Sequence, residues 1–216
     1  MTRSALWLGG TYLLGSIPTS LIVARVFGGI DLRAFGSRNL GATNLFRAMG
    51  WKAAVPVGLF DVLKGTIPVL LAQRVSNGPP DWPLFVGLAA VAGHVWSPFV
   101  RFKGGKGVAT AAGVFLALAP WALLVGAAVW GLVVKLTGYV SLGSMVASGA
   151  FVASMPLVHP GGPRSTLVAG LGVFGFIVFI HRANIRRLIA GTESRFGRKA
   201  ELADGGTGPA GQGSIP

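Results

Sequence analysis

The chain of 216 residues has no cysteine, only three histidines and only six acidic residues. Without cysteine, disulfide bonds and thiol chemistry are excluded. Three histidines scattered along the sequence argue against a structural zinc site. Six carboxylates are also too few to favour an active site built on paired acids.

Charged residues are scarce as well, at 12% of the chain, against about 25% in an ordinary soluble domain. Hydrophobic residues make up 52%, and the mean hydropathy is +0.65. These values indicate an integral membrane protein. The net charge of +13 comes from basic residues in short loops between apolar runs, so membrane orientation explains it better than nucleic-acid binding does.

The apolar runs predict an all-α membrane protein with one domain over residues 1–197 and a disordered, Gly/Pro-rich cytoplasmic tail over 198–216. The first run contains Pro18, which should kink or unwind a helix. The expected spans are 4–27, 53–72, 82–100, 106–118, 121–135, 139–157 and 165–180.

The region 108–134 allows two interpretations, because Ala119-Pro120 divides it. It is either one kinked span or two short helices, 106–118 and 121–135, that enter the membrane and return. With two helices, 15 of the 19 lysines and arginines fall on one side of the membrane. The positive-inside rule then favours seven transmembrane helices, with the N-terminus outside and the C-terminus cytoplasmic.

The stretch FKGGKGVAT, residues 102–110, has three glycines and two lysines at the start of a predicted helix. Bare backbone N–H groups, Lys106 and a helix N-terminus together favour a phosphate site. The stretch lacks the spacing of a Walker A loop, so it does not predict ATP binding. The alternative is a tight turn whose lysines only mark the cytoplasmic side.

Two further polar segments share that side. GSRNLGATNLFR, residues 36–47, offers hydroxyl, amide and guanidinium groups that suit an oxyanion or a polyol. Its alternative is an ordinary loop with a helix N-cap at Thr43 or Asn44. In HRANIRRLIAGTE, residues 181–193, a continuous helix would place His181, Asn184 and Leu188 on one face. The alternatives there are a basic stop-transfer cluster and an interfacial His181.

Charged groups also occur inside the spans. Asp61 and Lys64 form an i, i+3 pair of opposite charges, which are costly at membrane depth unless they are paired or face a polar cavity. The pair is either a structural ion pair or has a direct catalytic role. We expect His94 to be a packed, hydrogen-bonded histidine. Ser141 and Ser144 are expected either to border a cavity shared with these groups or to pack helices together through small residues.

Taken together, GSRNLGATNLFR, FKGGKGVAT and HRANIRRLIAGTE resemble the three motifs of the bacterial acyl-phosphate-dependent glycerol-3-phosphate acyltransferases, the PlsY family. The resemblance covers about residues 12–193. It implies transfer of a fatty acyl group from acyl phosphate to the 1-hydroxyl of sn-glycerol 3-phosphate, giving lysophosphatidic acid and phosphate. It also implies a seven-helix fold and a reaction without metal, cofactor, acyl-CoA or acyl carrier protein.

We assign roles within this resemblance as hypotheses. The reacting centre is expected to contain His181, Asn184 and Ser37, with either His181 or the donor's own phosphate as the base. Substrate phosphates and head groups are expected at Arg47, Lys106, Gly104, Gly105, Gly107, Thr43, Asn44 and Ser141. Supporting roles are expected for Asp61, Lys64 and Glu193, the last through an arginine.

The expected setting is the bacterial inner membrane, with the active site on the cytoplasmic side. The expected partners are acyl phosphate, glycerol 3-phosphate, membrane lipid and an enzyme that forms acyl phosphate, but no nucleic acid. The rival interpretation is a small transporter of phosphate or a phospholipid, which the break at Pro120 and the Asp61–Lys64 pair would suit. Against it, the hydropathy pattern has no two-fold repeat.

Overall fold

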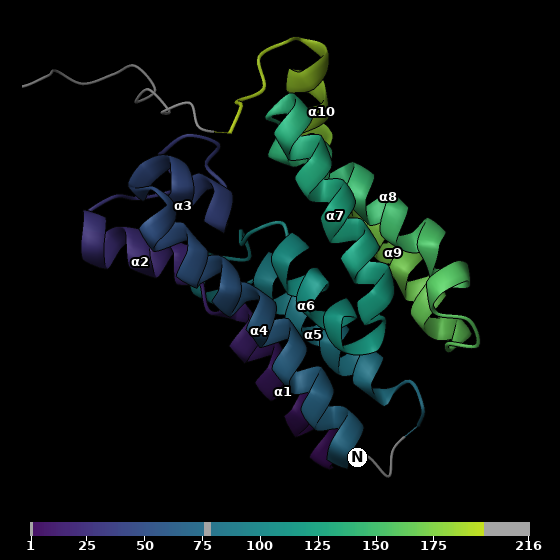
Figure 1. Ribbon diagram of the computed structural model, residues 1–216. Coiled ribbons are helices and arrows are strands. Elements are labelled where there is room, and N and C mark those ends of the chain that lie inside the picture. The colour runs from purple at the N-terminus through teal and green to yellow at the C-terminus, as the bar shows by residue number, and fades with distance from the viewer. Residues whose placement is uncertain (1, 76–78, 197–216) are drawn as a thin grey trace, which may run out of the picture.

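The computed structural model describes residues 2–75 and 79–196, and every regular element in these two ranges is a helix (Figure 1). The predicted all-α fold is therefore confirmed, while the predicted disordered tail lies outside the described residues. The helices are α1 (Thr2–Ser16), α2 (Thr19–Gly28), α3 (Ala42–Met49), α4 (Trp51–Val75), α5 (Trp82–Val95), the 3₁₀ turn η1 (Pro98–Val100), α6 (Val108–Leu118), α7 (Pro120–Thr137), α8 (Val140–Val158), α9 (Arg164–Ile180) and α10 (Arg182–Ile189).

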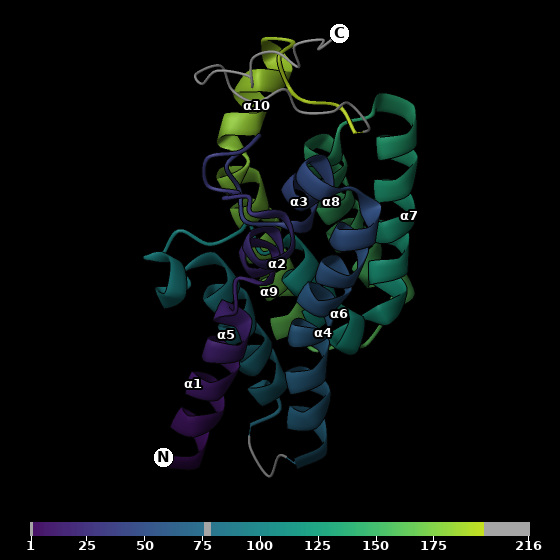
Figure 2. The ribbon, with the colours of Figure 1, turned by 90° about the vertical axis from the view of Figure 1, so that its left-hand side faces the viewer.

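The first apolar run is broken at Ile17-Pro18, as Pro18 predicts. Proline has no backbone N–H and crowds the preceding turn, so α1 ends at Ser16 and α2 begins at Thr19. After the break the chain changes direction, and α2 turns away from the line of α1 (Figures 1 and 2).

The polar region 28–51 is more ordered than a loop, because it contains α3. The residue before the helix is Gly41, in extended conformation, so the helix begins before Thr43 and Asn44. The predicted N-cap at one of those two residues is wrong. Asn44 is instead fully buried, and its side chain binds the loop that precedes the helix.

The last span does not continue straight through His181. Helices α9 and α10 meet there at a bend of 55°, so the continuous helix considered from the sequence does not form, although His181 and Asn184 both line the cavity described below. The His181 ring nitrogen Nδ1 lies 2.8 Å from the Ile177 carbonyl, which also accepts the His181 N–H. A side chain that competes for a helix carbonyl in this way favours a break.

Five of the described helical segments are long and apolar enough to cross a membrane, or six if α9 and α10 form one span. The predicted pair of helices around Pro120 is present as α6 and α7. However, α6 has only 11 residues, about 17 Å of helix against a hydrocarbon core of about 30 Å. Length and composition therefore support a multi-pass membrane protein, with five or six spans among the described residues where seven were expected.

Close helix crossings at glycines hold the N-terminal half together. A Cβ at Gly65 of α4 would lie 2.2 Å from the Thr110 carbonyl, and one at Gly113 of α6 would lie 1.9 Å from the Val62 carbonyl. Backbones this close need glycine, as in many membrane helix pairs. Helices α7, α8 and α9 pack in sequence as a second group, and α6 contacts both groups (Figure 1).

Candidate active site

A cavity of about 630 Å³ lies between the two helix groups. It is polar where the loops meet it and apolar along α6, α7, α8 and α9. Its lining includes these sequence-predicted residues: Ser37, Thr43, Asn44, Arg47, Asp61, Lys106, Gly107, Ser141, His181, Asn184 and Glu193. Three others, Gly104, Gly105 and Lys64, do not line it.

The loop of residues 102–107, here called the Gly-Lys loop, is hydrogen-bonded to the end of α5. The N–H groups of Gly104 and Gly105 donate to the carbonyls of Val95 (2.9 Å) and His94 (3.1 Å). A Cβ at Gly104 would lie 2.0 Å from the His94 carbonyl oxygen, so this glycine is needed for packing. The two amides expected to face a phosphate are thus already engaged. In the described ranges, the N–H groups of Lys106 and Gly107 have no backbone hydrogen-bond partner, and α6 begins directly after them.

Two cationic side chains face the polar end of the cavity. The Lys106 ammonium donates to Asn184 Oδ1, and burial lowers the pKa of Lys106 to about 8, with Glu193 opposing the shift. Burial also lowers the pKa of Arg47, whose Nη2 donates to the Ser194 carbonyl at 3.3 Å. Its buried Nε has no hydrogen-bond partner among the described residues. Half-desolvated cations with unused donors favour an anionic ligand.

Glu193, in the segment after α10, binds three side chains that belong to two helices, α8 and α10. Its Oε1 accepts from the Ser141 hydroxyl and from Asn184 Nδ2, both at 2.6 Å, and its Oε2 pairs with Arg187 Nε at 2.6 Å. Burial raises the pKa of this carboxyl, but the three hydrogen bonds outweigh burial and hold the pKa below its usual value. The arginine partner expected for Glu193 is therefore present, and Ser141 is bound to this carboxylate.

His181 is 3% exposed and lines the cavity. The Ile177 carbonyl beside Nδ1 can only accept a hydrogen bond, so the proton sits on Nδ1. Nε2 then carries a lone pair. An imidazole held in this tautomer is equipped to accept a proton.

In the polar segment 36–47, the Asn44 side chain binds the protein itself, whereas Ser37 and Thr43 line the cavity. The Asn44 amide donates to the carbonyls of Leu32 (3.3 Å) and Phe35 (3.0 Å), and its oxygen accepts the Ser37 N–H at 3.1 Å. Asn44 thus shapes the loop, although it was expected to bind a substrate. Ser37 is exposed and Thr43 is half-buried, and both residues line the cavity together with Arg47.

The charged pair in α4 is a buried ion pair. Lys64 Nζ lies 2.7 Å from Asp61 Oδ1, and both side chains are almost fully buried. Lys64 also donates to the Ile17 carbonyl at 3.3 Å, and the Thr19 hydroxyl donates to Asp61 at 3.2 Å. The pair therefore satisfies the polar groups that the α1–α2 break exposes, which supports a structural role.

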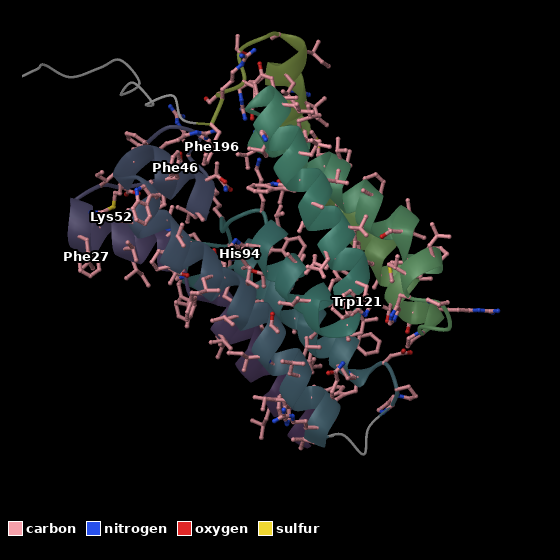
Figure 3. The ribbon with its side chains drawn as sticks, in the orientation of Figure 1. Phe27, Phe46, Lys52, His94, Trp121 and Phe196 are labelled. Atoms are coloured by element: carbon pink, nitrogen blue, oxygen red, sulfur yellow. The ribbon has the colours of Figure 1, made fainter. Side chains whose placement is uncertain are left out.

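The segment after α10 folds back over the polar end of the cavity. Phe196 stacks on Phe46 of α3 (Figure 3), and its N–H donates to the Gly138 carbonyl at 2.6 Å. Arg195 lies over the Tyr139 ring. Sequence analysis did not identify these contacts, because partners this far apart in the chain leave no local pattern.

Comparison with known proteins identifies the family to which the chain belongs. The family profile described as glycerol-3-phosphate acyltransferase matches residues 5–191. A glycerol-3-phosphate acyltransferase of Trichlorobacter lovleyi is 49% identical over 91% of this chain and 99% of its own. One from Thermus thermophilus is 46% identical over 93% and 99%. The crystal structure of PlsY (YgiH) in a glycerol 3-phosphate form is 40% identical, with a TM-score of 0.83 over 90% of this chain and 96% of its own. The chain belongs to the glycerol-3-phosphate acyltransferase family, in its integral membrane PlsY branch.

Proposed function

We propose that the chain transfers a fatty acyl group from acyl phosphate to the 1-hydroxyl of sn-glycerol 3-phosphate, giving lysophosphatidic acid and inorganic phosphate. The observation that carries this proposal is the single cavity in which Arg47, Lys106 and His181 meet an apolar wall. Such a cavity suits an acceptor with a phosphate and a donor with both a phosphate and a hydrocarbon chain. The two solved relatives support the acceptor and the product, because they are glycerol 3-phosphate and lysophosphatidic acid forms of PlsY.

The chemistry asks little of the protein beyond binding and alignment. Acyl phosphate is already an activated mixed anhydride. The acceptor oxygen attacks the carbonyl carbon, the bond from that carbon to the phosphate oxygen breaks, and phosphate leaves with the bonding electrons. The enzyme has to neutralise two phosphates and orient one hydroxyl, which is catalysis by proximity and electrostatics.

In this proposal Arg47, Lys106 and Ser37 hold the phosphate of glycerol 3-phosphate, with the N–H groups of Lys106 and Gly107. Thr43 and the region around Ser141 are left for the head of the donor. Asn44 and Glu193 act on the site by holding its loop and its side chains in place.

In this proposal His181 receives the proton of the attacking hydroxyl on Nε2. The departing phosphate is the competing base, since it is generated next to the same hydroxyl. Asn184 lies beside His181, bound to Glu193 and Lys106, and therefore links the phosphate site to the reacting centre.

The decisive experiment supplies the purified protein with palmitoyl phosphate and glycerol 3-phosphate and measures phosphate release. We expect release that requires both substrates, and no product when palmitoyl-CoA or palmitoyl carrier protein replaces the donor. Phosphate release without the acceptor, or transfer from palmitoyl-CoA alone, would contradict the proposed donor or acceptor.

We also propose a cytoplasmic active site in the bacterial inner membrane, with seven membrane helices counting α6. The basic ends at α10 and at the α7–α8 turn lie opposite the start of α1 and the end of α4, which supports a cytoplasmic site (Figure 2). Because the chain has no cysteine, single cysteines give unique labels. An impermeant maleimide on intact spheroplasts should label Arg164→Cys and not Arg186→Cys; the reverse would overturn the topology.

An enzyme that forms acyl phosphate is the expected functional partner, since this donor hydrolyses in water. Transport without chemistry, the rival interpretation, is not favoured by the family to which the chain belongs.

A further inference from the structure

His94 has no place in the reaction proposed above, yet it lies against the Gly-Lys loop. It belongs to the last turn of α5 and is 9% exposed, in the interior of the molecule (Figure 3). We infer that His94 is a positioning residue, which fixes Lys106 at the phosphate site through its packing on Gly105. The inference rests on the phosphate role proposed for Lys106.

The contact between His94 and the loop is direct. A Cβ at Gly105 would lie 2.1 Å from His94 Nε2 and 2.7 Å from the Leu40 carbonyl oxygen. The backbone at Gly105 is therefore clamped between the imidazole edge and the loop that leads to α3. The Gly105 N–H also donates to the His94 carbonyl at 3.1 Å, so ring and backbone hold the same residue.

The imidazole lies next to the buried ion pair of Asp61 and Lys64. His94 Nδ1 lies 3.7 Å from Asp61 Oδ1, and that carboxylate is fixed by Lys64 and Thr19. Lys64 in turn ties the break between α1 and α2. One rigid support therefore runs from α4 through the ring of His94 to the backbone immediately before Lys106.

Lys106 is thus held twice. Its backbone follows the residue that His94 clamps, and its ammonium is bound by Asn184. A small chamber of about 10 Å³, lined by Gly104, Gly105, Asp61 and His94, lies on the inner side of the loop. Removal of the ring would enlarge this chamber, and the loop could then move inward and draw Lys106 away from Arg47.

The test is a double-mutant cycle between His94 and Lys106, read as separate KM values for the two substrates. We expect His94→Ala to raise KM for glycerol 3-phosphate about tenfold, with kcat and the KM for palmitoyl phosphate within about twofold. In the Lys106→Ala background the same change should add less than about twofold, because the two residues act as one unit. His159→Ala, in the turn after α8, is the matched control and should match wild type.

His94→Asn is a second variant that separates a positioning effect from loss of the fold. Its amide still offers Asp61 a polar partner, but it lacks the ring edge that contacts Gly105. It should show the same KM effect. Thermal unfolding with added glycerol 3-phosphate gives a readout that needs no turnover: stabilisation should be strong in wild type, weak in His94→Asn and absent in Lys106→Ala.

Equal factors in both backgrounds, a kcat loss with unchanged KM, or wild-type behaviour of both His94 variants would overturn the inference. A wild-type protein that binds glycerol 3-phosphate but releases no phosphate would overturn the proposed reaction instead, and the thermal comparison would still decide the role of His94.

Discussion

Phe46 and Phe196 stack with ring centroids 4.5 Å apart and planes 10° from parallel. The first belongs to α3 and the second ends the described chain, so this contact closes the C-terminal segment over the polar end of the cavity. The same segment carries Glu193 and the carbonyl that binds Arg47.

Replacement of Phe196 with Ala should loosen that segment. An aromatic pair contributes about 0.5–1.5 kcal/mol beyond burial, and part of that loss should appear as a two- to tenfold rise in the KM for glycerol 3-phosphate. Steady-state kinetics would measure the change. Phe179→Ala, an exposed phenylalanine on α9, is the control; equal effects of the two changes would show that the stack has no bearing on the site.

Lys106→Ala should weaken acceptor binding far more than Arg186→Ala does. A hydrogen bond to a charged group contributes about 1.5–3 kcal/mol, or about ten- to a hundredfold in KM for glycerol 3-phosphate. Arg186 is exposed on α10 and does not line the cavity. Small and equal effects of both substitutions, measured at constant ionic strength, would reject the phosphate role for Lys106.

Burial lowers the pKa of Lys106 to about 8, and this gives the acceptor KM a defined pH dependence. The ammonium is charged below that pH and neutral above it, so KM for glycerol 3-phosphate should rise as the pH increases from 7 to 9.5. Lys106→Arg keeps its charge over this range and should show a flat profile, whatever its absolute KM. The two profiles measured in one buffer series make the comparison; parallel profiles would assign the pH effect to another group.

Glu193→Gln should destabilise the fold as well as the reaction. Glutamine preserves the size of the side chain but sets an NH₂ group against donors from Ser141, Asn184 or Arg187. An unsatisfied buried donor costs about 1–3 kcal/mol, which thermal unfolding in detergent would reveal as a lower Tm. Asp31→Asn breaks ion pairs at the exposed Arg25 and Arg33 and should cost less than about 1 kcal/mol.

The apolar wall of the cavity gives a prediction about the acyl chain. Ala112 of α6 lines the cavity, and Ala112→Phe should fill part of the space available to a hydrocarbon. Activity with palmitoyl phosphate should then fall relative to activity with octanoyl phosphate, by about 0.8 kcal/mol for each methylene excluded. Ala128→Phe, on an exposed face of α7, should leave the ratio of the two activities unchanged.

Much of the fold could be predicted because its signals are local. Pro18 breaks a helix wherever it occurs in one, and Pro120 begins a helix readily. The bend at His181 was missed because it depends on a ring that turns back to the carbonyl of Ile177. No spacing of residues in the sequence reveals that choice.

The site was predicted as a set of residue types more accurately than as a set of contacts. Lys106, Arg47 and His181 do meet in one cavity. The glycines of the Gly-Lys loop, read as bare N–H donors, are required instead because His94 and Leu40 lie against them. A glycine that faces a ligand and a glycine that faces a neighbouring helix look the same in a sequence.

The ion pair of Asp61 and Lys64 also bears on how the chain is assembled in the membrane. During synthesis α1 and α2 leave the ribosome before α4, so the Ile17 carbonyl at their break has no lysine to bind when it first reaches the bilayer. At that stage the Ile17 carbonyl accepts only local hydrogen bonds from Thr19, such as that from its N–H at 3.0 Å, and incompletely bonded backbone groups are unfavourable in hydrocarbon. The break between α1 and α2 should therefore reach its final conformation only after α4 is inserted, so Lys64 contributes to membrane insertion as well as to the stability of the finished fold.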